Sequence, residues 1–187
     1  MTESSLPRHL ILTGLSGAGK SAVGALLAQR IGWPFVDLDL SIARRRGLSI
    51  GAIFERLGER EFRRLECVAL RRALQSRRRT VIALGGGALL SATNRSLVRR
   101  FGYLVYLQVS CAEAARRLAR AHDRPLTLGT EGERLSHHRL VARLRDLLRL
   151  RLRGFAAADY RINVSRLSAA QVAYRIAVAL RAREIAN

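Results

Sequence analysis

The stretch that decides the fold is residues 9–21, which read HLILTGLSGAGKS. It opens with a short apolar run, HLILT, that leads directly into glycine, as a buried strand does when it ends in a turn. Residues 20–31 follow with apolar side chains at helical spacing, and Gly32 and Pro34 mark the end of that helix. The stretch therefore predicts a strand, a glycine-rich loop and a helix in direct succession.

The loop between this strand and helix matches the pattern GxxxxGK[ST] at every fixed position. Its glycines let successive backbone N–H groups turn toward a phosphate, and the helix N-terminus adds a positive dipole. Lys20 is expected to reach the outer phosphates, and the Ser21 hydroxyl to ligate Mg²⁺. The loop alone leaves the phosphoryl acceptor open among water, a nucleotide, a protein and a small alcohol. The residues predicted to bind ATP here are Gly14, Ser16, Gly17, Ala18, Gly19, Lys20 and Ser21.

Strands and helices alternate along the rest of the chain. Further strands are predicted at residues 35–38, 80–84, 103–107 and 161–164, with helical patterns between and after them. The helical region before residue 75 is predicted to break near Gly47 and Gly58. Parallel neighbours need crossover connections, so this alternation predicts an α/β three-layer, doubly wound domain with a five-stranded parallel sheet. We expect residues 1–187 to form one domain, with a mobile lid at about residues 122–136, where Pro, Gly and Thr replace the helical pattern.

Two aspartates, Asp37 and Asp39, stand at the end of the second predicted strand. Ligands collect at this edge of a parallel sheet, and the period-two geometry of a strand would turn both carboxylates the same way. One carboxylate can then hold Mg²⁺ through water, while the other accepts a hydrogen bond or a proton from the attacking hydroxyl. Without the neighbouring phosphate loop, solvated aspartates at a strand end would be an equally good interpretation.

Two further patterns are ambiguous by themselves. Arg63 and Glu66 stand three residues apart in a predicted helix, where such a pair is usually a surface ion pair. Gly85, Gly86 and Gly87 follow the third strand, where they could let a ligand approach bare backbone or simply form a tight turn.

Taken together, these patterns resemble the shikimate kinase family over nearly the whole chain. The resemblance rests on the phosphate loop, DLD at residues 37–39, FRxxE at residues 62–66, GGG at residues 85–87 and RPL at residues 124–126, in that order. It implies a P-loop kinase fold like that of nucleoside monophosphate kinases. It also implies an enzyme that uses ATP and Mg²⁺ to convert shikimate to shikimate 3-phosphate, in the biosynthesis of chorismate and the aromatic amino acids.

The resemblance assigns roles to individual residues. Lys20 and Ser21 would hold phosphates and metal, Asp37 would support the Mg²⁺ shell, and Asp39 would be the candidate base beside the acceptor hydroxyls. Arg63 would grip the carboxylate of shikimate in bidentate fashion, and Gly85, Gly86 and Gly87 would line its ring. Arg124 would be a catalytic lid arginine that also contacts ATP and stabilises charge on the moving phosphoryl group.

A second carboxylate ligand is harder to place, because residues 149–155 read RLRLRGF and lack the proline of the family's pattern. If Phe155 stands for the tyrosine of that pattern, the spacing selects Arg151. Arg149 and Arg153 would then lie on a solvated helix face. The lid also reads RPLTLG, and about eight additional residues separate Arg124 from the final arginine.

Composition narrows the class of protein. The net charge is +20, and only Lys20 among the 34 basic residues is a lysine. Such charge favours nucleic acid, but only 5% of residues are aromatic and they do not alternate with the arginines, so no specific nucleic-acid binding is expected. No apolar run approaches the roughly 18 residues of a membrane span, and Cys67 and Cys111 are isolated, as buried free thiols are. We expect a cytoplasmic protein without membrane contact, and the resemblance implies a monomer.

Two alternatives remain open at the level of sequence. The first is a kinase of the same fold that acts on another small hydroxy acid, such as gluconate. The second is a non-catalytic domain that senses a ligand, as in some transcriptional regulators. Those regulators carry a DNA-binding domain, for which we expect no room before Ser5.

Overall fold

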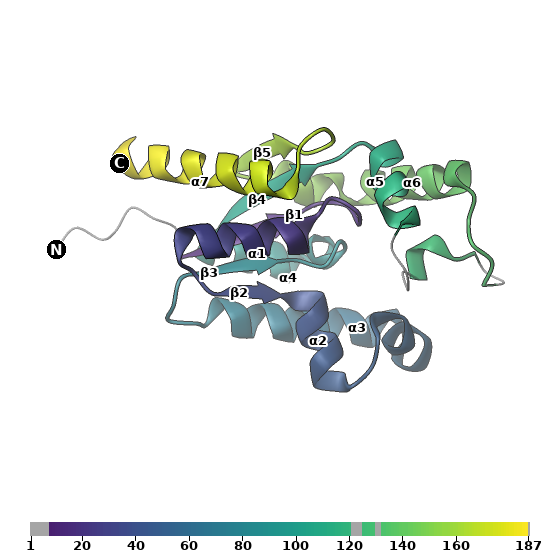
Figure 1. Cartoon of the computed structure of the whole chain (residues 1–187). Helices are drawn as coiled ribbons and strands as arrows, with labels where there is room; N and C mark the ends of the chain where they lie inside the picture. The colour runs from purple at the N-terminus through teal and green to yellow at the C-terminus, as the bar shows by residue number, and fades with distance from the viewer. Residues whose placement is uncertain (1–7, 121–124, 130–131, 187) are drawn as a thin grey trace.

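A computed structural model describes residues 8–120, 125–129 and 132–186 of the chain. Five parallel strands form one sheet in the order β2-β3-β1-β4-β5 (Figure 1). The predicted α/β class and five-stranded parallel sheet are therefore confirmed. The strands are β1 (His9–Thr13), β2 (Phe35–Asp37), β3 (Thr80–Ala83), β4 (Gly102–Gln108) and β5 (Tyr160–Asn163).

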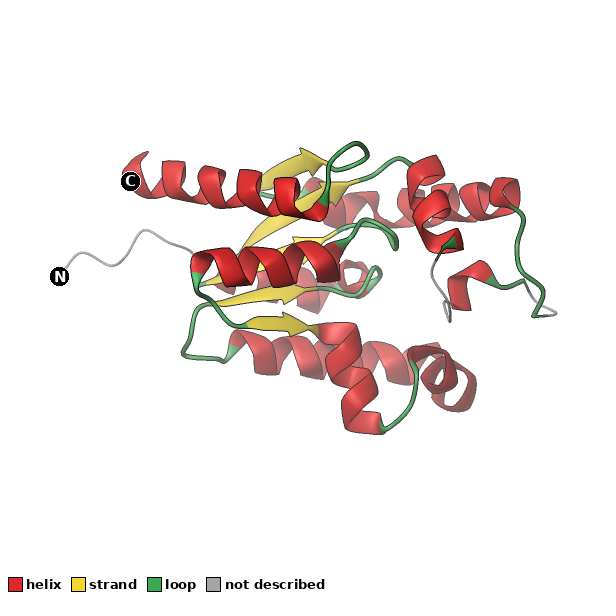
Figure 2. Ribbon diagram, viewed as in Figure 1, coloured by secondary structure: helices red, strands yellow, loops and turns green. Residues whose placement is uncertain are grey.

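Helices cover both faces of the sheet, which makes the three layers (Figure 2). In strand β1, Leu10 and Leu12 pack in the core cluster that includes residues of α1 and α7, whereas Ile11 packs in the cluster that includes residues of α3 and α4. Successive residues of a strand point to opposite faces, so burial on both faces explains the continuous apolar run of β1. The helices are α1 (Lys20–Ile31), α2 (Leu38–Arg46), α3 (Ile50–Leu74), α4 (Ala92–Phe101), α5 (Cys111–Ala119), α6 (His137–Ala156) and α7 (Ala169–Ala186), with short 3-10 turns η1 (Ala88–Leu90) and η2 (Pro125–Thr127).

Glycines end or bend the helices where the sequence predicted breaks. Gly32 caps the C-terminus of α1 and Gly47 caps that of α2, both with left-handed φ angles, of 71° and 63°. Gly58 has φ 76° and ψ 168° inside α3, which kinks the helix there. A positive φ costs glycine little and other residues more, so these positions fix the element boundaries.

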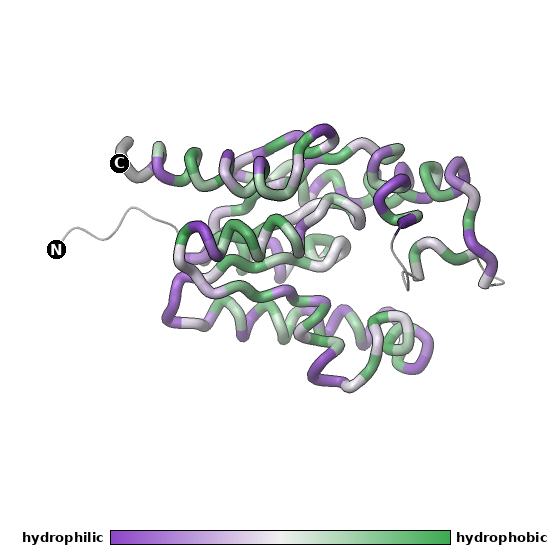
Figure 3. Tube along the Cα trace, in the orientation of Figure 1, coloured by the Kyte–Doolittle hydropathy of each residue, from purple (hydrophilic) through white to green (hydrophobic). Residues whose placement is uncertain are grey.

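The hydropathy pattern follows the layers. In Figure 3 the central strands are mainly hydrophobic, whereas hydrophilic turns recur along the outer helices. Cys67 and Cys111 are half-buried free thiols. Among the described residues, none of the helices combines the length and the apolarity that spanning a bilayer requires.

Candidate active site

The loop between β1 and α1 requires glycine at the two positions where neighbouring backbone comes closest to it. Gly14 has φ 151° and Gly17 has φ 84°. A methyl group at Gly14 would lie 2.6 Å from the carbonyl oxygen of Leu107, and one at Gly17 would lie 2.8 Å from that of Ala114. Both the backbone conformation and the close approach of β4 and α5 therefore exclude a side chain at these positions.

The N-terminus of α1 opens into this loop. Gly19 caps the helix with φ 87° and no side chain, so the amides of the first turn receive no capping hydrogen bond from it. The Lys20 Nζ donates to the carbonyl oxygens of Gly14 at 3.0 Å and Leu15 at 3.1 Å, which holds the ammonium over the loop. Amides, helix dipole and ammonium together make a site for a phosphate chain.

Ser21 and Asp37 join the phosphate loop to the end of β2. The Ser21 hydroxyl donates to Asp37 Oδ2 at 2.5 Å, and Asp37 Oδ1 accepts from the amide of Leu40 at 3.1 Å. A hydroxyl and a carboxylate oxygen are hard donors of the kind that Mg²⁺ uses beside phosphates and water, so the pair fits this ion.

The predicted strand geometry of the two aspartates is wrong. Strand β2 ends at Asp37, and Asp39 lies in the first turn of α2 rather than on the strand. The cause is local, since Asp37 acts as the N-cap of α2 and its side chain bonds the Leu40 amide. The two carboxylates consequently serve different neighbours instead of pointing the same way.

Asp39 lies against the glycine turn that follows β3. A methyl group at Gly85 would lie 2.6 Å from Asp39 Oδ1 and 2.5 Å from Glu66 Oε1. The absence of a side chain at Gly85 therefore leaves space beside the backbone for two carboxylates, one from α2 and one from α3.

The other two glycines face arginines. A methyl group at Gly86 would lie 2.8 Å from Arg151 Nη1, and one at Gly87 would lie 2.6 Å from Arg63 Nη1. Ser16 Oγ lies 3.5 Å from the same point at Gly86, which brings the phosphate loop to the turn. The structure thus gathers Asp39, Arg63 and Arg151, which lie far apart in the sequence, around Gly85, Gly86 and Gly87; we call these residues and Glu66 the glycine-turn cluster.

The Arg63–Glu66 pair is not the surface ion pair that its spacing usually indicates. Arg63 Nη1 donates to Glu66 Oε2 at 3.0 Å, and the Glu66 side chain is only 1% exposed. Burial raises the pKa of Glu66, and the charge of Arg63 offsets part of that rise. Burial by itself would lower the pKa of Arg63, but the charges and hydrogen bonds of Glu66 and Glu59 outweigh it and raise the pKa of Arg63. Arg63 is thereby held charged and oriented by two carboxylates.

Arg151 is the arginine of residues 149–153 that reaches the cluster. Its Nε and Nη1 are buried without a hydrogen-bond partner, and burial, followed by the charge of Arg63, lowers its pKa. Arg149 and Arg153 are exposed, and Arg149 pairs with Asp146 at 3.3 Å. Two guanidinium groups side by side, one of them with unused donors, form a site for an anion such as a carboxylate.

The lid region is only partly described, and Arg124 lies outside the described residues. Leu128 and Arg134 form an isolated antiparallel bridge. Arg143 of α6 donates to the carbonyl oxygens of Leu126 at 3.3 Å and Leu128 at 2.7 Å. These bonds tie η2 and the residue after it to α6.

Sequence analysis paired Glu66 with Arg63 but did not predict that Glu66 is buried, and it missed the contact between Glu59 and Arg63. Glu59 Oε1 accepts from Arg63 Nη2 at 3.0 Å, and the buried Glu66 shares the glycine turn with Asp39. The signal was present, because Glu59, Arg63 and Glu66 recur at intervals of four and three residues on one helix face. Periodicity reveals such a face, but it does not reveal that the face is buried.

Comparisons with known proteins bear on the family and the fold of this chain. The family model described as shikimate kinase matches residues 16–181. A shikimate kinase of Geobacter sulfurreducens is 40% identical over 181 residues, which cover 97% of this chain and 95% of the relative. One of Chlorobium chlorochromatii is 43% identical over 157 residues, covering 84% and 82%. A solved shikimate kinase of Acinetobacter baumannii in complex with shikimate superposes with a TM-score of 0.85 at 33% identity, covering 96% of this chain and 95% of that one.

Proposed function

Because the chain belongs to the shikimate kinase family, we propose that it transfers the γ-phosphoryl group of ATP to a hydroxyl of shikimate, giving shikimate 3-phosphate and ADP. The observation that carries the proposal is the convergence of Arg63 and Arg151 with Asp39 on the three glycines after β3. Two arginines match a carboxylate, one aspartate matches a hydroxyl, and the bare glycine backbone leaves room for a compact ring.

On the acceptor side, the proposed roles follow from charge and burial. Arg63 and Arg151 bind the carboxylate of shikimate and fix the orientation of its ring. Asp39 accepts a hydrogen bond from the attacking hydroxyl and takes its proton as the oxygen bonds to phosphorus. Glu66 accepts a hydrogen bond from Arg63 Nη1 at 3.0 Å and so keeps this guanidinium charged and in place.

On the donor side, the backbone amides of residues 14–21 and Lys20 bind the phosphates of ATP. Ser21 and Asp37 would hold Mg²⁺, which when bound screens the negative charge that opposes attack on the γ-phosphate. Arg124 is proposed to add positive charge at the transferring group from the lid, at about residues 122–136. Ser16 lies beside Gly86, so the two half-sites are adjacent, as transfer between bound partners requires.

The direct test is ADP release, measured in a coupled assay with Mg²⁺ and ATP. We expect saturable release with shikimate and only background release with quinate, with gluconate and without an acceptor. Gluconate-dependent release would instead support the alternative of a kinase for another hydroxy acid. Saturable ATP binding without turnover on any acceptor would support a ligand-sensing domain.

The proposal extends to the domain organisation, the oligomeric state and the cellular location of the enzyme. We infer one domain over residues 1–187 that acts as a monomer in the cytoplasm, where ATP is available, with no specific nucleic-acid or membrane partner. Gel filtration with light scattering tests the monomer, because a stable dimer would double the measured mass.

A further inference from the structure

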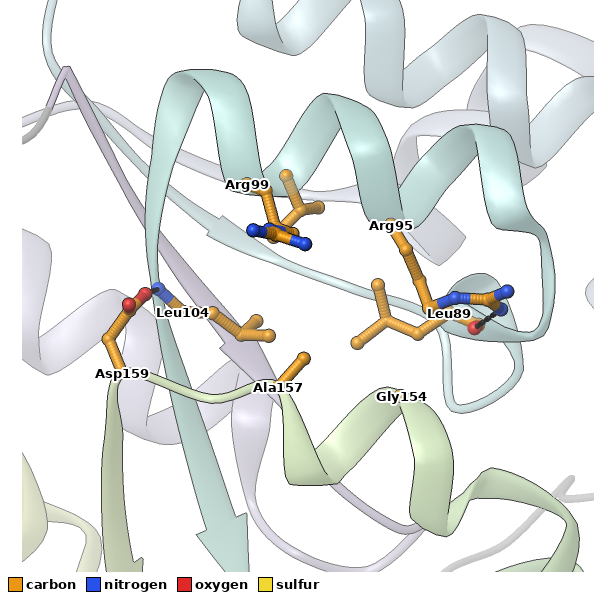
Figure 4. Close-up of a pocket in the computed structure, with 8 residues that line it drawn as sticks. Leu89, Arg95, Arg99, Leu104, Gly154, Ala157 and Asp159 are labelled. Atoms are coloured by element: carbon orange, nitrogen blue, oxygen red, sulfur yellow. Dashed lines mark hydrogen bonds between the residues drawn. The ribbon is translucent and has the colours of Figure 1, made fainter.

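A second cavity lies between α4 and the C-terminal end of α6, apart from the phosphate loop and the glycine-turn cluster (Figure 4). Its volume is about 490 Å³. None of its lining residues belongs to the candidate active site described above. A volume of this order is large enough for a small organic molecule, for which pockets typically measure about 300–1,000 Å³.

The floor of the cavity is apolar. Leu89, Val98 and Leu104 line it, and their exposed fractions are 5%, 1% and 3%. Gly154 of α6 forms one wall, where a methyl group would lie 2.6 Å from the Cβ of Leu89. Because these side chains are already almost fully removed from water, the floor is a preformed hydrocarbon wall that a ring or a branched chain can contact through dispersion rather than through new burial of exposed surface.

Two of the three charged lining residues are already bound to backbone. Arg95 Nη1 donates to the carbonyl oxygens of Leu89 at 2.7 Å and Leu90 at 2.8 Å. Asp159 Oδ2 accepts from the amide of Leu104 at 2.7 Å, and the Asp159 amide donates to the Leu104 carbonyl oxygen at 2.9 Å. Figure 4 shows both contacts at the edges of the cavity. These bonds fix the shape of the cavity rather than leave it to collapse.

Arg99 is different. It is an exposed residue of α4 that lines the cavity across from Ala157 and Asp159 (Figure 4). Among the side chains that the structure describes, none forms an ion pair or a hydrogen bond with Arg99. Helix α4 reads ATNRSLVRRF and holds no acidic residue that could pair with it along the helix. An arginine without a partner at the rim of an apolar floor is the arrangement that binds an amphipathic anion.

We propose that this cavity binds a small organic carboxylate with an apolar body. The carboxylate bonds the guanidinium of Arg99, and the apolar body covers Leu89, Val98 and Leu104.

The test is a titration of the full chain, labelled at its Leu and Val methyl groups, with 3-phenylpropionate, followed by NMR. We expect saturable shifts at the methyl signals of Leu89, Val98 and Leu104, with a dissociation constant on the order of 1 mM for a ligand of this size. 3-Phenylpropionamide, which has the same ring and chain but carries no charge, is expected to bind more weakly.

Two variants of adjacent arginines provide the control. Arg99→Ala should weaken binding of 3-phenylpropionate by about fivefold or more, as loss of a charged hydrogen bond predicts. Arg100→Ala should leave it within about twofold, because Arg100 lies over the Phe101 ring and does not line the cavity. Ala157→Trp, which fills the cavity from an exposed position, should abolish the methyl shifts.

Three results would overturn the proposal. One is the absence of saturable shifts at the three methyl groups. Another is equal affinity of the Arg99→Ala and Arg100→Ala variants. The third is an amide that binds as tightly as the carboxylate. Because the shifts are read at cavity residues, binding of the probe at Arg63 and Arg151 does not imitate a positive result.

Discussion

Asp39 is the residue with the most direct chemical consequence, because its carboxylate lies against Gly85. Asp39 is the second residue of α2, which begins at Leu38. The spacing DLD pointed to a functional pair, but no periodicity in the sequence could separate the roles of the two aspartates. The N-cap bond of Asp37 separates them, since it ends the strand and turns Asp39 toward the glycines.

Asp39→Asn is predicted to abolish most turnover while leaving the nucleotide in place. We expect kcat to fall by about two to four orders of magnitude, since the amide cannot take the proton of the acceptor hydroxyl. The dissociation constant for ATP, measured by calorimetry, should stay within about twofold because Asp39 lies on the acceptor side. Unchanged turnover with lost ATP affinity would assign Asp39 to the phosphate site instead.

Arg63→Lys is predicted to weaken binding of the acid. Lysine keeps the charge but loses the planar fork of donors, so KM for shikimate should rise about tenfold or more. Arg64→Lys is the matched control, since Arg64 is exposed and bonds Glu61 at 2.7 Å on the outer side of the same helix. Equal KM values in the two variants would place Arg63 outside the substrate site.

At the element scale, Glu113 of α5 accepts hydrogen bonds from two arginines of the same helix. Glu113 Oε2 accepts from Arg116 Nε and Glu113 Oε1 from Arg117 Nε, both at 2.7 Å. Arg117 in turn donates to the carbonyl oxygen of Val164 at 2.8 Å, just after β5. The hydrogen bond from Arg116 is the main cause that lowers the pKa of Glu113 to about 2. Arg117, which Glu113 orients, thus couples α5 to the edge of the sheet at β5.

Glu113→Gln is predicted to lower stability in a pH-dependent way. The folded pKa of Glu113 lies below its unfolded value of 4.5, so its contribution is complete above pH 4.5 and is lost as the pH falls toward 2. With allowance for solvent screening, we expect a loss of about 1 kcal/mol at pH 7, or about 2–4 °C in Tm. Thermal unfolding at several pH values should show that the difference in Tm between the unmodified protein and the variant becomes smaller below pH 4.5. Glu55→Gln, at an exposed position of α3, is the control, and an equal pH-independent effect in both variants would contradict the prediction.

At the scale of the whole molecule, the sequence sufficed for the architecture because its signals are local. The bounds of β1 and α1 were predicted without error, and the breaks at Gly47 and Gly58 follow from glycine itself. The glycine-turn cluster was harder, since no local rule says that Glu66 is buried, and only the spacing to Phe155 in the family's pattern selected Arg151 rather than Arg149. Those facts depend on how α3 and α6 pack on the sheet, which only the folded chain contains.

The net charge of +20 predicts adventitious binding to nucleic acid. We expect sequence-independent association with duplex DNA at low salt that weakens by about tenfold or more between about 50 and about 200 mM salt, because bound counterions are released on association. Fluorescence anisotropy with two unrelated duplexes measures this. A preference for one sequence that persists at the higher salt would show a genuine nucleic-acid site.

The position of β1 in the centre of the sheet also has a consequence for synthesis on the ribosome. β1 emerges early, but its neighbours begin only at Thr80 and Gly102. The loop after β1 packs on backbone at Leu107 and Ala114, which emerge later still. A nascent chain therefore carries the complete phosphate-binding motif long before it can bind a nucleotide. ATP consequently cannot guide the early steps of folding and binds only after the sheet has assembled.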